Sequence, residues 1–435
     1  MRWYLGAAAL LLLALVLQLG LLAYAMYVLL ALLVVSRLFA RSWVESVTAE
    51  RECNRLNAEV GDTVAVIVTV RNAGRLPVPW VLMEDLLAWP TTIPGPAPLR
   101  LKGRQMKMGM LWPQGQATMY YQLQFQMRGY FQIGPLVLES GDLFGLHRRY
   151  HVAADPNFVL VYPRIVPLLG FDISSRRPIG EVRMSNRIYE DPTRISGIRD
   201  YQPGDPMNRV HWRSTARVGT LQSKVYEPST VAGTTLLLDF HQDGFDRRHE
   251  PYRSELAVTA AASLANAVYQ MGQQIGLVTN GRDAAERIRD EGWRHDFRTR
   301  KAALQAASLE KRNDRLTPLV VETRRGAEQL GRVLEMLARV ELSDGLPFPR
   351  LLLEAAGRLP RDATVVALLA DVSVETAIAL SSLRRRGFAV TAIVNVYEES
   401  DYARLAGRLL AEGIESRHLK NPEGLPALCG RHVLR

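Results

Sequence analysis

Three kinds of hydrophobic pattern follow one another along the chain. Residues 3–35 are apolar without a charged side chain, whereas residues 56–162 alternate apolar and polar positions in short segments separated by Gly and Pro. From about residue 234, short continuous apolar runs alternate with longer amphipathic segments. These patterns are typical of membrane helices, half-buried strands and an α/β domain, respectively. The sequence thus predicts a membrane-anchored chain that combines a β domain with an α/β domain.

The amino-terminal apolar run is longer than one membrane span. One spanning helix needs about 20 apolar residues, so the run predicts either a single tilted helix or a tight hairpin of two short helices that turns near Gln18–Gly20. We favour a transmembrane hairpin over residues 1–45, because Arg2 precedes the run and further arginines follow it, beginning with Arg37. Positive charge at both ends is typical of cytoplasmic ends. We expect a multi-pass protein of the inner membrane, anchored in the lipid bilayer, whose body faces the cytoplasm.

The alternating region predicts a β-sandwich. Its first segment, LNAEVGDTVAVIVTV at residues 56–70, alternates apolar and polar side chains and is rich in β-branched residues, which favours a strand. Similar segments follow, among them ATMYYQLQFQM and GYFQIGPLVLES, with Gly and Pro between them and no helical periodicity. Short strands joined by such turns are typical of a β-sandwich, which we place at residues 46–165.

The last part of the chain predicts a doubly wound, Rossmann-like α/β domain at residues 231–435. TTLLLDF is apolar throughout, as expected of a strand buried on both faces, and SELAVTAAASLANAVYQM follows as an Ala-rich amphipathic helix. QIGLVTN, TVVALLA and FAVTAIVNV predict further strands between helices, some of which end at Gly. This alternation favours a mostly parallel sheet. Residues 282–316 are highly charged and break the alternation, so we expect an exposed excursion there.

Composition and missing motifs narrow the classes of function. The net charge is +10, which suits nucleic acid, anionic lipid or an acidic partner. We find no aromatic-interleaved RNA motif or zinc-finger spacing and therefore expect no nucleic acid. The chain also lacks G-x-x-x-x-G-K-[ST], G-x-S-x-G and H-E-x-x-H. We accordingly predict neither an enzyme nor a small-molecule substrate. The two cysteines, Cys53 and Cys429, form no C-x-x-C pair, which argues against a disulfide framework.

Acidic residues follow two of the predicted parallel strands. DFHQDGF supplies Asp239, His241 and Asp243, and ADVS supplies Asp371. The carboxyl ends of parallel strands share one edge of the sheet, and carboxylates gathered there suit a hard cation such as Mg²⁺. The alternative is that these residues cap helices and line loops, since Asp371 directly precedes a predicted helix.

Two other clusters of charged or metal-binding residue types give weaker evidence for a functional site. The pair His147 and His151 has the i,i+4 spacing of a zinc site on a helix, but this stretch predicts a strand or loop. Arg384–Gly387 fits the solvated end of a helix, where cations interact favourably with the helix dipole, and a phosphate or lipid role is the alternative.

A basic segment at residues 166–230 contains the densest cluster of charged and aromatic residues, GIRDYQPGDPMNRVHWRSTARVGTLQSKVYEP at residues 197–228. Pro203–Gly204 predicts a turn, and a short helix and a strand follow it. Arg–carboxylate pairs and the Trp212 ring favour an ionic and aromatic clamp or a partner-docking surface. A catalytic role would require a nucleophile beside His211, and the sequence offers only Ser214, Thr215 and Tyr201 near it.

This segment resembles the domain-of-unknown-function 58 family, whose pattern is R-x-Y-x-P-G-D, then I/V-H-W, then A-R, with leucine and glutamate downstream. The matching residues are Arg199, Tyr201, Pro203, Gly204, Asp205, Val210, His211, Trp212, Ala216, Arg217, Leu221 and Glu227. The wider layout is similar too: a membrane hairpin, a β-rich domain, this motif, and then a domain similar to von Willebrand factor A domains.

The resemblance implies a partner and a metal loop. Such proteins typically accompany a MoxR-type AAA+ ATPase and are thought to be non-enzymatic adaptors in a chaperone-like or assembly system. An A-type domain often holds a metal through a D-x-S-x-S loop, a separate threonine and a later aspartate. The corresponding residues here are Asp239, His241, Asp243 and Asp371, with Thr323 as a candidate threonine. Because both serines are missing, the resemblance implies a degenerate Mg²⁺ site.

We therefore expect a membrane-anchored adaptor or scaffold that works with a MoxR-type ATPase. Two alternatives stay open. One is a metal-dependent hydrolase that uses the acidic cluster, and the other is an extracytoplasmic adhesion module.

Overall fold

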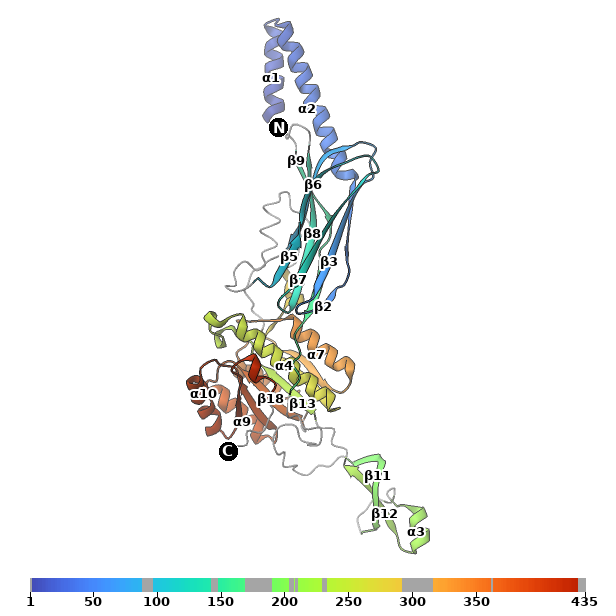
Figure 1. The fold of residues 1–435 in the computed structure, drawn as a ribbon, viewed down its shortest axis with the longest axis vertical. Coiled ribbons are helices and arrows are strands. Elements are labelled where there is room, and N and C mark those ends of the chain that lie inside the picture. Colours follow the sequence, from blue (N-terminus) through green and yellow to red (C-terminus); the bar gives the residue numbers. More distant parts are fainter. Residues whose placement is uncertain are drawn as a thin grey trace.

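A computed structural model gives the fold of the chain. It describes residues 2–87, 97–141, 148–168, 190–202, 207, 210–228, 233–291, 316–360 and 363–428. An apolar helical hairpin, a β region and an α/β domain follow one another along the long axis of the molecule (Figure 1). The coarse prediction of an apolar amino-terminal helix followed by a mixed α/β fold with several sheets is confirmed.

The amino-terminal run forms two helices, α1 (Arg2–Val16) and α2 (Gly20–Ser46). The chain reverses at Leu17–Leu19, where Gln18 has a φ of 52°. Ala7, Ala14 and Ala23 are buried in the hairpin, and small side chains let helices approach closely. In the described part of the chain, one helical stretch, Gly20–Arg37, is long and apolar enough to cross a membrane. The apolar part of α1 is shorter.

The β region consists of two sheets packed face to face. One has the order β1-β3-β7-β5 and the other the order β2-β10-β8-β4-β6, with β9 also paired to β8. The strands of the first sheet are β1 (Val47–Cys53), β3 (Thr63–Asn72), β7 (Gln116–Phe125) and β5 (Leu99–Gly103). Those of the second are β2 (Asn57–Glu59), β10 (Asn157–Tyr162), β8 (Gly129–Gly141), β4 (Val78–Leu87), β6 (Met106–Leu111) and β9 (Arg148–Ala154).

The core of the β region follows the period of two. On β3 every second side chain is fully buried, from Val64 to Val70, because successive side chains point to opposite faces of a sheet.

A buried ionic cluster joins the two sheets inside the β region. Arg51 on β1 donates from Nε to Asp85 Oδ2 on β4 over 2.8 Å, and Tyr121 Oη on β7 donates to the same oxygen over 2.6 Å. Arg51 Nη1 also donates to the carbonyl of Asp155 over 2.6 Å and to Asn157 Oδ1 over 3.1 Å. Burial and the nearby carboxylate raise the pKa of Tyr121, so it stays a donor. Nothing in the sequence pattern predicted this cluster.

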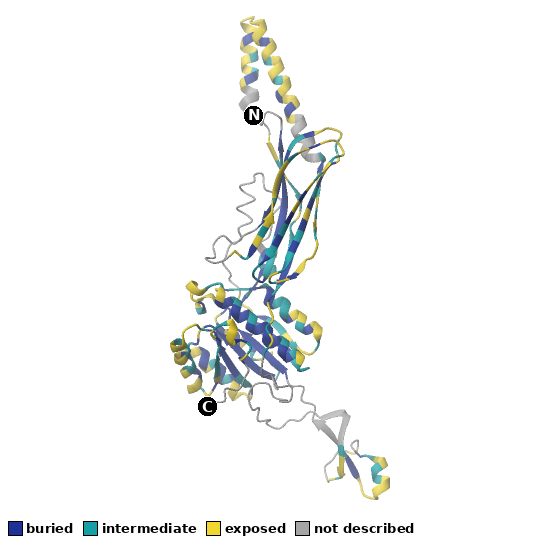
Figure 2. Cartoon of the chain, viewed as in Figure 1, coloured by how far each residue is buried: buried dark blue, intermediate teal, exposed yellow. Residues whose placement is uncertain are grey.

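The α/β domain is built on a six-stranded sheet with the order β16-β14-β13-β18-β19-β20. Its strands pair in parallel except β16, which is antiparallel to β14. The strands are β13 (Gly233–Leu238), β14 (Gln274–Thr279), β16 (Leu319–Arg324), β18 (Ala363–Leu369), β19 (Ala389–Val394) and β20 (Glu415–His418). The central strands are buried on both faces (Figure 2).

Helices cover both faces of this sheet. They are α4 (Tyr252–Gln270), α7 (Ala327–Arg339), α8 (Phe348–Ala355), α9 (Val374–Arg385) and α10 (Glu399–Ala411). Leu236 and Leu238 pack in the apolar cluster with α4 and α7, whereas Leu237 packs in the cluster with α8, α9 and α10. The alternation of β13 side chains thus divides the core into two layers. Short 3₁₀ turns lie at Gln242–Gly244, Arg247–His249 and Pro422–Gly424.

The expectation that residues 282–316 form an exposed excursion is wrong for their first part. β15 (Arg282–Asp283) pairs with β17 (Val340–Glu341), and α5 (Ala284–Glu291) follows it. Ala284 and Ile288 are buried, because α5 turns its few apolar side chains inward despite a charged sequence. Residues 292–315 lie outside the described residues.

The segment that precedes the α/β domain forms a two-stranded unit. β11 (Glu190–Asp200) pairs antiparallel with β12 (Gln222–Pro228), and α3 (Trp212–Val218) lies between them in the chain. We call residues 197–224, the part of this unit whose side chains the structure largely describes, the signature unit.

Candidate functional site

Polar residues follow the strands of the α/β sheet at its carboxyl edge. Asp239 follows β13, Asn280 follows β14 and Asn395 follows β19. Asn280 Nδ2 donates to Asp239 Oδ1 and to the Leu346 carbonyl, each over 2.9 Å, and its Oδ1 accepts the Phe240 amide over 2.7 Å. Both asparagines follow apolar runs that predict strands, in QIGLVTN and FAVTAIVNV. Their position at the carboxyl ends of these strands would have identified them as residues of this edge, but they were not among the predicted site residues.

Asp239 is a buried carboxyl group whose neighbours include the His241 ring, the charge of which opposes the effect of burial on the pKa of Asp239. It is 7% exposed, and its hydrogen bonds come from Asn280 and, over 3.2 Å, from the His241 amide. Burial raises the pKa of Asp239 to about 6, although these donors oppose the shift. Neighbouring Asp371 raises the pKa further. In the described part of the chain, no arginine or lysine pairs with Asp239.

The other three predicted metal ligands follow β13, as Asp239 does, or the neighbouring β18, but their side chains do not converge on one site. His241 Nδ1 accepts the Asp243 amide over 3.3 Å at the start of the 3₁₀ turn. The side chain of Asp243 is 82% exposed, and Asp371 is exposed as well. The alternative of a capping role for Asp371 is wrong, since Ser373 Oγ caps α9 by accepting the Thr376 amide over 3.1 Å.

These residues do not fit a Mg²⁺ site. Among the described residues, no group of three His, Cys, Asp or Glu side chains is placed to hold a metal. Thr323, the candidate hydroxyl ligand, lies within the sheet, where its Oγ1 is 2.7 Å from Thr235 Oγ1. Mg²⁺ requires a near-octahedral set of oxygen ligands, and the predicted residues supply one buried carboxyl group and two exposed ones. We therefore assign no metal chemistry to this edge.

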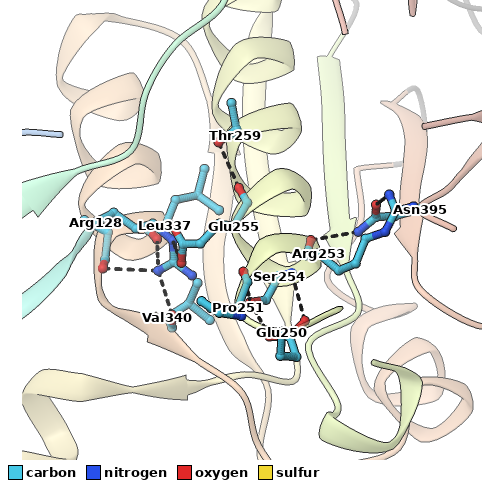
Figure 3. Close-up of polar contacts among 11 residues, drawn as sticks. Arg128, Glu250, Pro251, Arg253, Ser254, Glu255, Thr259, Leu337, Val340 and Asn395 are labelled. Atoms are coloured by element: carbon cyan, nitrogen blue, oxygen red, sulfur yellow. Dashed lines mark hydrogen bonds and ion pairs between the residues drawn. The ribbon is translucent and has the colours of Figure 1, made fainter. Parts of the chain in front are cut away.

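An arginine of the β region reaches into the α/β domain beside this edge (Figure 3). Arg128, between β7 and β8, donates from Nη1 to the carbonyls of Leu337 over 2.8 Å and Val340 over 2.7 Å. The last carbonyls of a helix lack intrahelical partners, and Arg128 satisfies those of α7. Its Nε lies 3.3 Å from Glu255 Oε1 on α4, and its guanidinium carbon is 5.6 Å from the centre of the Phe240 ring. Arg128 thus joins the two regions at the residue next to Asp239.

A second arginine holds α4 to the same edge. Arg253 Nη1 donates to Asn395 Oδ1 over 3.1 Å and to the Lys420 carbonyl over 2.9 Å, and Asn395 Nδ2 donates back to the Arg253 carbonyl over 2.9 Å. Burial lowers the pKa of Arg253. Glu250 accepts from the amide and hydroxyl of Ser254 at the first turn of α4. These charges fasten elements together, so they give the edge rigidity.

The signature unit uses its polar residues for its own turns. His211 Nδ1 accepts the Ser214 amide over 3.1 Å and caps α3. Gln222 Nε2 donates to Asp200 Oδ1 over 2.6 Å, and the Tyr201 amide donates to the Leu221 carbonyl over 2.9 Å. Because Nδ1 accepts this backbone amide, the neutral ring carries its proton on Nε2 and has no free lone pair to act as a base for a serine, which disfavours the catalytic interpretation.

The outer surface of the signature unit is apolar and basic. Trp212 is 63% exposed and Val218 62% exposed. Other exposed residues of this unit include Ile198, Arg199, Asp200, Met207, Arg213, Arg217 and Leu221. A ring with this exposure supplies little packing to a clamp, whereas exposed Trp and Arg are enriched in binding surfaces.

Several predicted residues are outside the described part. Gly204 and Asp205 lie there, as does the side chain of Glu227, so the predicted Arg–carboxylate pairs with Asp205 and Glu227 stay predictions. His147 lies there as well, and His151 stands on β9, a strand rather than a helix.

Comparison with known sequences gives a family match to the region just described and one relative. The family described as "Protein of unknown function DUF58" matches residues 197–340. The chain is similar to the uncharacterized protein YeaD of Bacillus subtilis (strain 168), with 26% identity over 243 residues, which are 55% of this chain and 57% of the relative. The chain therefore spans little more than half the length of that curated relative.

Among solved structures, the similarity covers about a quarter of the chain. The CARDB domain of the PF1109 protein from Pyrococcus furiosus is 14% identical, with 26% of this chain and 86% of that one covered and a TM-score of 0.19. The ASH/PapD-like domain of human CEP192 is 15% identical, with 26% and 83% covered and a TM-score of 0.18. Likeness at this level carries no argument about function. The relationship that does bear on the site is the sequence match to DUF58, which begins at Gly197 in the signature unit and includes the sheet edge at Asp239.

Proposed function

We propose that this protein is a membrane-anchored, non-enzymatic adaptor that binds a MoxR-type AAA+ ATPase at the cytoplasmic face of the inner membrane. The observation that carries the proposal is the exposed apolar and basic surface of the signature unit, centred on Trp212 and Arg217. This surface lies within the DUF58 match, and aromatic and arginine side chains dominate the energy of protein interfaces.

The architecture supports presentation of a binding domain at a membrane. α2 passes directly into β1 at Val47, so the anchor and the β region share one continuous backbone. Arg128 then ties the β region to the α/β domain through buried contacts. These connections would help an adaptor, because a bound partner keeps a defined position relative to the membrane only if the binding domain is fixed to the anchor.

The strand order supports an A-type, Rossmann-like assignment of the α/β domain. When the six strands of this sheet are renumbered 1 to 6 in chain order, the spatial order β16-β14-β13-β18-β19-β20 becomes 3-2-1-4-5-6. This is the strand order of doubly wound dinucleotide-binding folds. Ligands and partners of such sheets meet the carboxyl edge, where Asp239 and His241 lie. We propose that this edge is the second contact surface of the partner.

Co-purification of the full chain in detergent tests the proposal. Wild-type protein and the Trp112→Ala variant should retain a MoxR-type ATPase, whereas Trp212→Ala combined with Arg217→Ala should lose it. Trp112 is the matched control, because it is exposed to 66% and Trp212 to 63%. Retention of the ATPase by the Trp212 variant, or its absence from wild-type preparations in every nucleotide state, would refute the proposal.

The side of the membrane has its own test. A reporter fused to the carboxyl terminus should signal from the cytoplasm. An extracytoplasmic signal would favour the adhesion module, and turnover of a phosphate or peptide ester with an added divalent ion, lost in Asp239→Asn, would favour the hydrolase.

A further inference from the structure

We propose that the end of the β region beside α2 lies on the membrane surface and binds anionic lipid headgroups. We call this end the membrane-proximal tip and define it by the exposed residues Arg71, Arg75, Leu76, Trp112, Arg148 and Arg149. The inference rests on the proposed membrane anchoring by α2.

Hydrogen bonds fix one half of the tip to the end of α2. The Ala73 amide donates to the carbonyl of Ser46, the last residue of α2, over 2.9 Å. Asn72, which is fully buried, donates from Nδ2 to the carbonyls of Leu76 over 2.8 Å and Trp112 over 3.2 Å. The β3–β4 turn and the β6–β7 turn are therefore held together directly beside the anchor helix.

Strand register places the other half at the same end. Val78 at the start of β4 pairs with Leu111, next to Trp112. Val81 on β4 pairs with Ser140 near the end of β8. Ser140 in turn pairs with Arg149 on β9. α2 contacts both β8 and β9, and Figure 1 shows this end of the β region beside the last turns of α2.

The chemistry of the tip suits an anionic lipid surface. Trp112 is 66% exposed and Leu76 41% exposed. Tryptophan is enriched at the headgroup level of membranes, where its ring is apolar and its N–H is polar. Arginines near an anionic surface are attracted to the lipid headgroups by their charge. The half-buried carboxylate of Glu139 lies 3.7 Å from the guanidinium of Arg148, whose side chain is 67% exposed.

The length of α2 brings the tip within reach of the headgroups. The apolar stretch ends at Arg37 and the helix at Ser46, which corresponds to about 14 Å along the axis. The polar interfacial layer is about 5–8 Å thick on each side, and helix tilt shortens the distance further. A tip that lies alongside the last turns of α2, with long arginine side chains, spans the remaining gap. This position favours lipid over a protein neighbour.

Tryptophan quenching in reconstituted full-length protein tests the inference. The vesicles contain phosphatidylcholine brominated on the acyl chains near the headgroup, with or without phosphatidylglycerol. We expect Trp112→Phe to lose part of the bromolipid-quenched emission, and Trp212→Phe, its equally exposed counterpart, to lose none. The Trp112 component should shrink without phosphatidylglycerol. It should also shrink in Arg148→Gln/Arg149→Gln, but not in Arg100→Gln/Lys102→Gln, which removes the same charge from exposed positions on β5.

The outcomes separate the inference from the anchoring on which it rests. If the chain floats with vesicles but Trp112→Phe leaves the quenching unchanged, the anchor holds and the tip lies in water, free for a protein neighbour, so the inference fails alone. Equal quenching on neutral vesicles overturns the part that concerns anionic headgroups. A chain that does not float overturns the anchoring and the inference together.

Discussion

A buried aspartate of the β region, Asp85, and a buried aspartate at the carboxyl edge of the α/β sheet, Asp239, have different kinds of partner. Asp85 in the β region is fully buried between the Arg51 guanidinium and the Tyr121 hydroxyl. Asp239 at the sheet edge is almost as buried, but its partners are an amide side chain and a backbone N–H. The first carboxylate therefore has an arginine as a permanent positive partner, whereas the second has no arginine or lysine partner among the described residues and is affected by the His241 ring charge more weakly than by its two hydrogen bonds.

This difference indicates which region is optimised for stability. A paired buried charge holds strands together, whereas an unpaired one costs free energy at neutral pH because burial penalises the ionised form. Such costs cluster where a protein keeps a surface for binding or chemistry. By this criterion, the Asp85 cluster stabilises the β region, whereas the buried Asp239 carboxylate lowers the free energy of unfolding at the carboxyl edge of the α/β sheet.

Breaking the paired cluster should have the largest effect. Arg51→Ala leaves Asp85 buried without its cation, and removal of one partner of a buried pair costs about 3–5 kcal/mol. Denaturant unfolding of the full chain in detergent measures the change. Arg55→Ala is the control, since Arg55 and Asp62 form an exposed pair worth about 0–1 kcal/mol. Equal effects of the two substitutions would remove the distinction on which the comparison rests.

The unpaired aspartate should show itself in the pH dependence of stability. The pKa of folded Asp239 is raised from 3.8 to about 6, so its contribution to stability is fully present below pH 3.8 and is lost as the pH rises through about 6. A shift of this size corresponds to about 3 kcal/mol. Asp239→Asn, which keeps an acceptor for Asn280, should flatten the unfolding free energy between these pH values and raise it at pH 7.

Asp243→Asn is the matched control for this pH profile, because the Asp243 side chain is 82% exposed. A wild-type profile that stays flat over the same range would show that Asp239 is compensated after all.

The joint between the regions should have a smaller effect. Arg128→Ala leaves the carbonyls of Leu337 and Val340 without their donor, and hydrogen bonds from charged groups contribute about 1.5–3 kcal/mol. Hydrogen exchange should become faster at the carboxyl-terminal turn of α7 while the core of the β region keeps its protection. Uniform loss of protection in both regions would instead show that they unfold as one unit.

The smallest change in stability is expected at the signature unit. Trp212→Ala removes a ring that is 63% exposed, so the unfolding free energy should change by no more than about 0.5 kcal/mol. ATPase retention should nevertheless fall. A loss of more than about 2 kcal/mol, on the scale of a buried side chain, would restore the clamp interpretation.

The local sequence predicted the elements better than their polar contacts. β3 was predictable because its burial alternates with a period of two. β13 was predictable because a strand buried on both faces is apolar throughout. The charged segment that contains α5 misled the prediction, since its two buried apolar side chains, Ala284 and Ile288, are few among many charged neighbours.

The candidate site was predictable only in part. Asp239, His241, Asp243 and Asp371 were placed at one sheet edge because parallel strands share their carboxyl ends. Whether they can bind a metal could not be predicted in the same way, since metal binding depends on the direction in which each side-chain oxygen points in the folded protein. Thr323 lies within the sheet beside Thr235, and a strand position alone does not reveal that depth.

Local patterns in the sequence were enough to predict the apolar amino-terminal helices, the alternating β region, the α/β alternation and the signature motif, because each depends on the spacing of neighbouring residues. The partners of Arg51, Arg128 and Arg253 became known from the folded chain, since their contacts with Asp85, Leu337 and Asn395 join residues 34, 209 and 142 positions apart. Charges separated by such distances in the chain meet only when the fold brings their strands and helices together. For that reason, the tertiary structure alone separated the compensated aspartate from the uncompensated one.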